Sequence, residues 1–197
     1  LQTKLELFAE EHPAMDAETA GLVSSLREQL DRLTALVHTL LEMSNLQSVS
    51  RTDQIALAPL VEEILTDLTP LAQKNNISLQ QDCEELGMVG SDALIYRLVF
   101  NLVENGIKYN RPGGAVRVTL QQEKQTAVLR VADTGPGIPA DCRESIFQPF
   151  FRVDKSRSRE MGGVGLGLAL VREIAVLHGG SVTVESSSEN GTTFVVT

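Results

Sequence analysis

Two asparagines, Asn101 and Asn105, lie four residues apart in a segment whose apolar spacing predicts a helix over residues 92–109. Residues four apart share one face of a helix, and Lys108 lies on that face as well. Amide oxygens are hard, neutral ligands that suit Mg²⁺, which completes its shell with waters and substrate phosphates. The pattern therefore indicates a metal and phosphate site. A solvated polar helix face is the alternative interpretation.

An acidic residue and two glycines come directly after a strand predicted over residues 126–132. These residues are Asp133, Gly135 and Gly137. A carboxylate fixed at a strand end can accept a hydrogen bond from the exocyclic amine of adenine, whereas guanine presents a carbonyl oxygen there and would be rejected. The glycines would let the main chain approach a planar base closely. The sequence favours an adenine site, although an ordinary D-x-G turn has the same letters.

The most basic window of the chain lies between residues 147 and 160. It begins with Phe147, Phe150 and Phe151. Its cations are Arg152, Lys155, Arg157 and Arg159, against the two acids Asp154 and Glu160. Guanidinium and ammonium groups at this density suit a polyphosphate, while the window is too short to hold nucleic acid well.

The glycine-rich sequence G-G-V-G-L-G-L occupies residues 162–168 and opens a helix predicted over residues 165–178. The exposed N–H groups and the dipole at a helix start favour anions. A Walker P-loop is excluded because Leu168 stands where that motif needs Lys. A dinucleotide-binding fingerprint is excluded because a charged loop, and not a strand, precedes the glycines.

The elements that must hold these residues alternate between helices and strands from residue 53 onward. A further helix is predicted over residues 59–74, with a kink at Pro70. Strands are predicted over residues 77–81, 88–90, 115–122, 126–132, 181–186 and 192–196. This order predicts an α+β fold in which residues 53–197 form an α/β sandwich, with helices on one face of a mixed sheet.

The first 52 residues predict a helical hairpin. Asp16 follows a turn at His12 and Pro13 and is expected to cap the second helix. Apolar residues spaced as in a heptad seam follow on that helix: Leu26, Leu30, Leu33, Val37 and Leu40. One hairpin cannot bury both this seam and a second apolar edge, so we expect a partner hairpin and a dimeric four-helix bundle. The alternative is a hairpin packed on its own domain.

The composition of the 197-residue chain limits its function. Its 42% hydrophobic residues suit a domain with an appendage, and no apolar stretch approaches the roughly 20 residues that cross a bilayer. The 17 Lys and Arg against 26 Asp and Glu give a net charge of −9, which argues against nucleic-acid binding. Cys83 and Cys142 form neither a CxxC pair nor a disulfide framework.

Four motifs, in this order, resemble those of the ATP-binding domain of bacterial sensor histidine kinases. N-L-V-E-N-G-I-K-Y at residues 101–109 resembles the N box, and D-T-G-P-G-I at residues 133–138 resembles the first glycine box. F-Q-P-F-F-R-V-D-K-S-R-S-R resembles the F box and ATP lid, and G-G-V-G-L-G-L resembles the second glycine box. The resemblance covers residues 53–197 as the catalytic domain. Residues 1–52 resemble part of the family's dimerisation and histidine phosphotransfer hairpin.

The resemblance implies a role for each site residue. Asn105, helped by Asn101, would hold Mg²⁺. Asp133 would bind the adenine amine, and Tyr109 would border the base. Lys108 and Arg157 would meet phosphates. The other residues implied to contact the nucleotide are Gly135, Gly137, Ile138, Arg152, Lys155, Gly163, Val164, Gly165, Leu166, Gly167 and Leu168.

The function that the resemblance implies is that of the cytoplasmic catalytic region of a two-component sensor kinase in a cell membrane. Such a protein transfers the γ-phosphate of ATP to a histidine and then to an aspartate of a response regulator. The implied cofactors are ATP and Mg²⁺. The implied partners are a second copy of the chain, bound through the hairpin, and a response-regulator receiver domain. No nucleic acid is implied, and a membrane is implied only through segments outside this chain.

The sequence departs from the family pattern in two places. Val164 stands where the second glycine box often carries Thr or Ser. The phospho-accepting motif, roughly H-E-L-x-T-P, is absent, and Leu1 fits a position just after it. His38 lies on a predicted helix without that motif. We therefore assign no phospho-acceptor histidine, and this chain alone is not expected to phosphorylate itself.

Other protein classes share the same nucleotide-binding fold. Gyrase, mismatch-repair and heat-shock-chaperone ATPases carry a water-activating Glu one helical turn before the metal-binding Asn, and Asn101 occupies that position here. Hydrolysis should therefore be poor, which favours transfer to an external acceptor over a non-kinase ATPase. Anti-sigma serine kinases lack the hairpin. An inactive nucleotide-binding regulatory module remains the other alternative.

Overall fold

The computed structural model describes residues 16–153 and 165–197 of the chain. The turn and helix end predicted before Asp16 lie outside these ranges. So do four of the predicted site residues, Lys155, Arg157, Gly163 and Val164.

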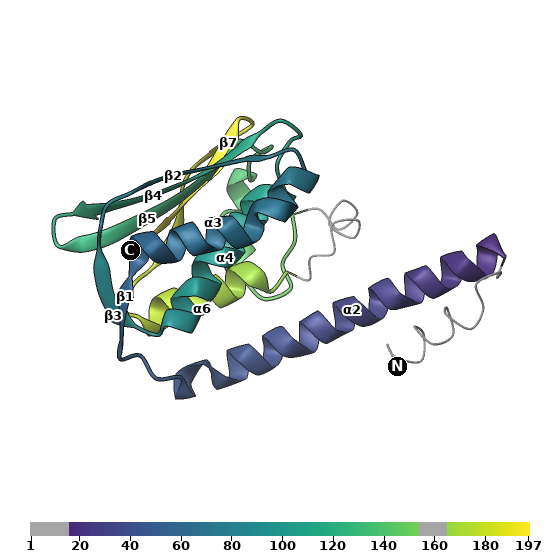
Figure 1. Ribbon diagram of the computed structural model, residues 1–197, viewed down its shortest axis with the longest axis horizontal. Coiled ribbons are helices and arrows are strands. Elements are labelled where there is room, and N and C mark those ends of the chain that lie inside the picture. The colour runs from purple at the N-terminus through teal and green to yellow at the C-terminus, as the bar shows by residue number, and fades with distance from the viewer. Residues whose placement is uncertain (1–15, 154–164) are drawn as a thin grey trace.

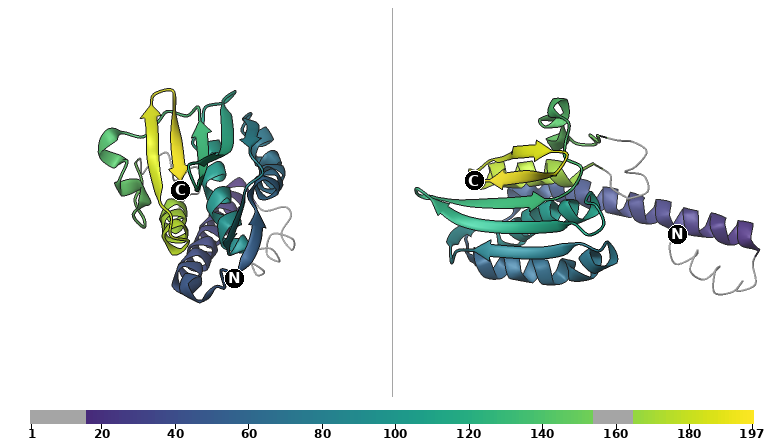
Figure 2. Two further views of the ribbon diagram at one scale, coloured as in Figure 1. Left: turned by 90° about the vertical axis from the view of Figure 1, so that its left-hand side faces the viewer. Right: turned by 90° about the horizontal axis from the view of Figure 1, so that it is seen from above.

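The described chain forms a layer of helices packed on one face of a sheet, which confirms the predicted α+β class (Figure 1 and, end on, the left view of Figure 2). The helices are α2 (Ala17–Asn45), α3 (Leu57–Lys74), α4 (Asp92–Lys108) and α6 (Gly167–Leu177), with short 3₁₀ turns η1 (Leu46–Ser48), η2 (Ala140–Cys142) and η3 (Ser145–Phe147). The strands are β1 (Asp53–Ala56), β2 (Ser78–Cys83), β3 (Gly87–Gly90), β4 (Ala115–Glu123), β5 (Thr126–Asp133), β6 (Val182–Ser188) and β7 (Gly191–Val196).

The main sheet is mixed, as predicted. Its strand order is β2-β4-β5-β7-β6, in which β2 and β4 are parallel and the other neighbours are antiparallel. Because β5 is the middle strand, Asp133 at its end has a neighbour on each side, Val116 of β4 and Thr192 of β7. β1 and β3 form a separate antiparallel pair. The sequence does not predict β1, because its four residues bury only Ile55 and show no periodicity.

Side chains that alternate along the strands build the core between the sheet and the helices. In β4, Val116, Val118 and Leu120 are at most 1% exposed, whereas Arg117 between them points to solvent. The helical layer contributes residues such as Leu102 of α4, which is fully buried in the same cluster. This period of two along the strand and the apolar stripe of α4 fix which face of each element meets the other.

Helix α3 begins at Leu57, two residues earlier than predicted. Pro59 therefore lies in the first turn, where proline is tolerated because the N–H that it lacks has no partner there in a helix. Pro70 lies inside α3, and the helix continues beyond it to Lys74. The side chains predicted to share one face, such as Leu60 and Ile64, are buried in the core.

Helix α2 begins where predicted, since the Asp16 carboxylate accepts a hydrogen bond of 2.7 Å from the Thr19 N–H. Figure 1 shows α2 extending well beyond the sheet and its helices. Its last turn continues into η1, where Leu46 is buried in the core. Most of the predicted seam is exposed, at 45% for Leu26, 56% for Leu33, 55% for Val37 and 45% for Leu40. Among the described residues no helix, α2 included, is long and apolar enough to span a bilayer.

Candidate functional site

Helix α4 carries a polar face opposite its buried residues. The half-buried side chains on this face are Asn101, Glu104, Asn105 and Lys108. The Asn101 Nδ2 donates a hydrogen bond of 2.7 Å to the Arg97 carbonyl one turn earlier. The Oδ1 of the same amide faces α6, where a Cβ added to Gly167 would lie 2.9 Å from it. The polar face of α4 and the start of α6 therefore meet at Asn101.

Gly106 lies inside α4, although glycine weakens a helix by about 1 kcal/mol relative to alanine. A Cβ at this position would lie 3.1 Å from a Val116 methyl group and 3.5 Å from the Asp133 Cβ. The missing side chain lets α4 pack closely on β4 and β5, and the buried contacts offset the weak helix propensity. The same close approach brings Asp133 next to the polar helix.

The Asp133 carboxylate accepts a main-chain hydrogen bond. Its Oδ1 accepts a hydrogen bond of 2.8 Å from the Gly135 N–H, and Thr192, which pairs with Asp133 in the sheet, has a second N–H group nearby. Burial raises the pKa of Asp133 above its ordinary value, and these two N–H groups partly oppose the rise. A fixed, partly desolvated carboxylate is a strong acceptor for an amine of a bound molecule.

A hydrogen-bond network ties the end of α4 to the Asp133 turn. The Asn110 Nδ2 donates to the Gly106 carbonyl at 2.9 Å and to the Ala115 carbonyl at 3.0 Å. The Thr134 hydroxyl donates to Asn110 Oδ1 at 3.0 Å and accepts from the Ala115 N–H at 2.9 Å. Asn110 and Thr134 cannot be recognised from the sequence, because Asn after a helix and Thr in a turn are ordinary choices there.

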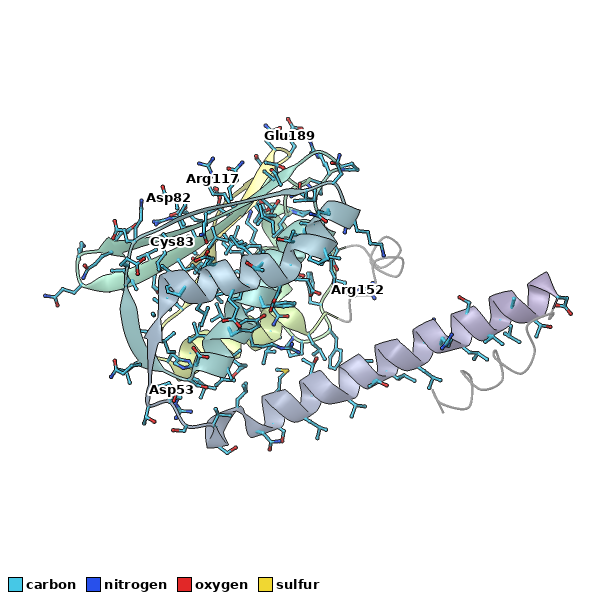
Figure 3. The ribbon with its side chains drawn as sticks, viewed as in Figure 1. Asp53, Asp82, Cys83, Arg117, Arg152 and Glu189 are labelled. Atoms are coloured by element: carbon cyan, nitrogen blue, oxygen red, sulfur yellow. The ribbon has the colours of Figure 1, made fainter. Side chains whose placement is uncertain are left out.

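Tyr109 and Arg152 lie together at the C-terminal end of α4. The Tyr109 carbonyl oxygen would be 2.7 Å from a Cβ on Gly135, so the end of α4 contacts the turn of residues 133–138 (the acid–glycine turn). Burial raises the pKa of the Tyr109 hydroxyl, and the nearby Arg152 charge lowers it to a lesser extent. The Arg152 Nε and Nη2 are buried and have no hydrogen-bond partner among the described residues. Figure 3 shows Arg152 at this end of the helical layer. Buried donors of this kind suit a phosphate or ribose oxygen.

The start of α6 is an uncapped helix N-terminus. Gly165 adopts a φ of +77°, so the helix begins at Gly167 and not at the predicted residue 165. Leu166 at the N-cap position forms no side-chain cap hydrogen bond, so no side chain of the described residues is seen to cap the first turn. Leu166 is 3% exposed and Leu168 packs against the core, so both hold the turn in place. Free N–H groups at the positive end of a helix dipole suit an anion.

The turn that follows Asp133 rests on the hairpin between β6 and β7. Gly137 adopts a φ of +80° and lies directly against the Ser188 carbonyl, so no side chain fits there. The Ile138 N–H donates a hydrogen bond of 2.7 Å to the Ser187 hydroxyl. Figure 3 shows Glu189 at the tip of the same hairpin. The hairpin therefore fixes the main-chain path at Gly137 and Ile138, both of which are predicted site residues.

Two features of the candidate site bear on phosphate and metal binding: the ion pair of Lys108 and the distribution of His, Cys, Asp and Glu side chains. The Lys108 Nζ forms an ion pair of 2.7 Å with Glu104, so a phosphate must take Lys108 from this partner. Within residues 16–153 and 165–197, no group of three or more His, Cys, Asp or Glu side chains could hold a metal ion.

Helix α4 thus contacts two of the other predicted site segments, the strand end at Asp133 through Gly106 and the start of α6 through Asn101. Asn101 and Asn105 come from α4, Asp133 and Gly135 from the end of β5, and Gly167 from α6. The arrangement offers an acceptor for an amine, amide oxygens for a cation, and helix N–H groups for an anion.

Comparison with known proteins supports one family. Residues 90–197 match the family described as "Histidine kinase-, DNA gyrase B-, and HSP90-like ATPase". The chain is 38% identical over 184 residues to the sensor histidine kinase RppB of Synechocystis sp., a match that covers 91% of this chain and 40% of RppB. This chain therefore spans less than half the length of that relative.

Solved structures agree with this assignment. The mycobacterial sensor histidine kinase MprB superposes with a TM-score of 0.64 at 27% identity, over 74% of this chain and 95% of that one. The histidine kinase ThkA, solved in complex with the response regulator TrrA, superposes with a TM-score of 0.73 at 26% identity, over 98% of this chain and 56% of that one. The chain belongs to the histidine kinase-, DNA gyrase B-, and HSP90-like ATPase family, and these relatives within it are sensor histidine kinases.

Proposed function

We propose that this chain binds Mg-ATP and, as part of a longer sensor kinase, transfers the γ-phosphoryl group to a histidine and then to an aspartate of a response regulator. The observation that supports this most is that α4 contacts both the strand end at Asp133, through Gly106, and the start of α6, through Asn101. Asp133, Asn101 and the start of α6 match an adenine amine, a cation and a phosphate in turn.

In this proposal Asp133 accepts a hydrogen bond from the adenine amine and Tyr109 borders the base. The cations proposed to bind and orient phosphate oxygens are Lys108, Arg152, Lys155 and Arg157. Arg152 supports this role because two of its buried nitrogens have no partner among the described residues. The residues proposed to line the nucleotide are Gly135, Gly137, Ile138, Gly163, Val164, Gly165, Leu166, Gly167 and Leu168.

Asn105 and Asn101 are proposed to hold Mg²⁺. The fit rests on Asn101, whose amide nitrogen is engaged by the Arg97 carbonyl while its oxygen faces the first turn of α6. When bound, the ion supplies neutralisation of the charge on the phosphates. The residues of the chain then have to position the phosphates and exclude water. Asn101 cannot act as a base toward water, which supports transfer over hydrolysis.

The partners and the division of the chain are parts of the same proposal. ThkA was solved with a response regulator, and we extend that class of partner to this chain. We assign residues 1–52 to a partial dimerisation and phosphotransfer hairpin and residues 53–197 to the catalytic domain. The intact protein would be a membrane-bound sensor with this region on the cytoplasmic side.

Replacing Asn105 with Ala tests the metal role. We expect Mg-ATP to bind at least about tenfold more weakly, because a ligand oxygen is lost. Isothermal titration calorimetry with ATP in the presence of Mg²⁺ and of EDTA would show that the loss is specific to Mg²⁺. Asn45→Ala, at an exposed helical position in α2, is the control. An Asn105→Ala variant with the wild-type dependence on Mg²⁺ would remove Asn105 from the metal site.

We further propose that α2 forms a homodimer through its exposed seam. Four of its apolar side chains are at least 45% exposed in the single chain. Side chains that recur at heptad spacing gain most by packing against the same stripe of a second helix.

Replacing Val37 with Glu tests this dimer. A charge in an apolar seam must be desolvated, so we expect dimerisation to weaken by at least about tenfold. Sedimentation equilibrium measures the dissociation constant. Ser25→Glu adds the same charge at an exposed position off the seam and should dimerise like the wild type. A wild-type chain that remains monomeric, or a Val37→Glu variant that dimerises unchanged, would contradict the assignment.

A further inference from the structure

The β6–β7 hairpin meets the candidate nucleotide site at one serine. The Ser187 hydroxyl accepts a hydrogen bond of 2.7 Å from the Ile138 N–H and lies 3.0 Å from the Thr192 hydroxyl. Its carbonyl oxygen accepts a hydrogen bond of 2.6 Å from the Arg143 Nη2. Ser187 is therefore bonded to the turn after Asp133, to β7 and to the segment beyond the turn.

Both hydrogen-bond partners of the Ser187 hydroxyl, Ile138 and Thr192, belong to segments that adjoin Asp133. Ile138 follows Gly137, which has no room for a side chain against the hairpin, so the hydrogen bond to Ile138 fixes the far end of the acid–glycine turn. Thr192 lies opposite Asp133 in the sheet and is 4% exposed, so its position is tied to that of the strand end that carries the carboxylate. Loss of the Ser187 hydroxyl would loosen the two segments that adjoin Asp133, the turn at Ile138 and β7 at Thr192.

An irregularity in β6 selects Ser187 for this position. Val184 pairs with Phe194, but Ser186 pairs with Thr193, so Glu185 is an extra residue in the register. Without this bulge Ser186 would lie opposite Thr192. The bulge turns Ser187 toward the site and leaves Ser186 exposed, and bulges beside functional sites commonly redirect a side chain in this way.

We infer that Ser187 is a positioning residue that holds the Asp133 carboxylate in line with the adenine amine. It acts through the Ile138 main-chain N–H and the Thr192 hydroxyl and does not itself touch the nucleotide. This inference rests on the proposed function, since it assumes that Asp133 binds adenine. The specificity for adenine over bases without the amine then depends on the hairpin as well as on the acid.

The test compares two nucleotides and two serines by calorimetry on the 197-residue chain. We expect Ser187→Ala to weaken Mg-ADP binding by about tenfold, the effect of one to two lost hydrogen bonds. Purine riboside 5′-diphosphate lacks the exocyclic amine, so its binding should weaken much less. Ser186→Ala removes a hydroxyl that points away and should bind both ligands like the wild type. Ser187→Thr retains the hydroxyl and should restore the preference for ADP.

The outcomes separate this inference from the proposed function. Wild-type chain that fails to bind Mg-ADP rejects the proposed function and the inference with it. Wild-type binding together with unchanged ADP affinity in Ser187→Ala, or an equal loss for both nucleotides, rejects the inference alone. Should Ser187→Ala fail to fold in thermal unfolding, Thr192→Val removes the partner hydroxyl at nearly constant volume. It should show the same selective loss, and unchanged selectivity would count against the role of Ser187.

Discussion

Asp133→Asn is expected to bind Mg-ADP at least about a hundredfold more weakly than the wild type, because a charged acceptor for the adenine amine is lost. The amide can instead present its NH₂ group to a bound base, which suits the carbonyl oxygen of guanine. The variant should therefore bind GDP more tightly than the wild type does while it binds ADP more weakly. The ratio of ADP to GDP affinity falls by both changes together. Calorimetry with both nucleotides measures this ratio. Equal affinity of the wild-type chain for ADP and GDP would refute the role of Asp133.

The same residue predicts a dependence on pH. Burial raises the pKa of Asp133, so its folded-state pKa lies above that in the unfolded chain. Ionisation of Asp133 therefore lowers the stability of the free fold, an effect that is absent at pH values below the unfolded pKa and complete above the folded pKa. The pH dependence of ADP binding has the opposite sign, because the ionised carboxylate is the stronger acceptor for the adenine amine. ADP affinity should weaken as the pH falls through the raised pKa, and Asp133→Asn should lose this dependence.

Gly135→Ala is expected to lose both nucleotide binding and stability. Its Cβ would lie 2.7 Å from the Tyr109 carbonyl oxygen and 2.8 Å from Asp133 Oδ1, closer than carbon and oxygen approach each other. The main chain or the carboxylate must move, and strain of this kind costs about 1–3 kcal/mol of the free energy of unfolding. Urea unfolding measures the loss of stability, and calorimetry with Mg-ADP measures the loss of binding.

A second glycine provides the matched control. A Cβ on Gly87 in β3 would meet only the Ile55 carbonyl at 3.4 Å, an ordinary contact. Gly87→Ala should therefore bind Mg-ADP like the wild type. If Gly135→Ala also binds normally, the close contact between the helix end and the acid–glycine turn has no part in the site.

Long periodic elements and the sequence motifs could be predicted from the chain alone. The strand pattern before Asp133 and the polar face with Asn101 required only periods of two and 3.6, and in the structure both patterns form the predicted elements, β5 and α4, which pack together at Gly106. The start of α3 was misplaced because Pro59 is compatible with the first helical turn as well as with the position before it. β1 could not be found because a four-residue strand with one buried side chain has no period to detect.

The supporting residues of the site could not be predicted, and the reason is geometric. Three serines follow one another at Ser186, Ser187 and Ser188, and the sequence does not distinguish them. Only the extra residue Glu185 in the strand register decides that Ser187 faces Thr192. Asn110 likewise acquires its role from the close packing at Gly106, a contact between segments that no local pattern records.

The position of β7 has a consequence for synthesis of the protein. β7 follows β6 in the chain but lies between β5 and β6 in the sheet. While a ribosome has yet to release the residues of β7, the edge of β5 lacks its partner, and Thr192 has not reached Asp133. An unpaired strand edge is a template for pairing with other chains, so the nascent chain is exposed to aggregation over this interval.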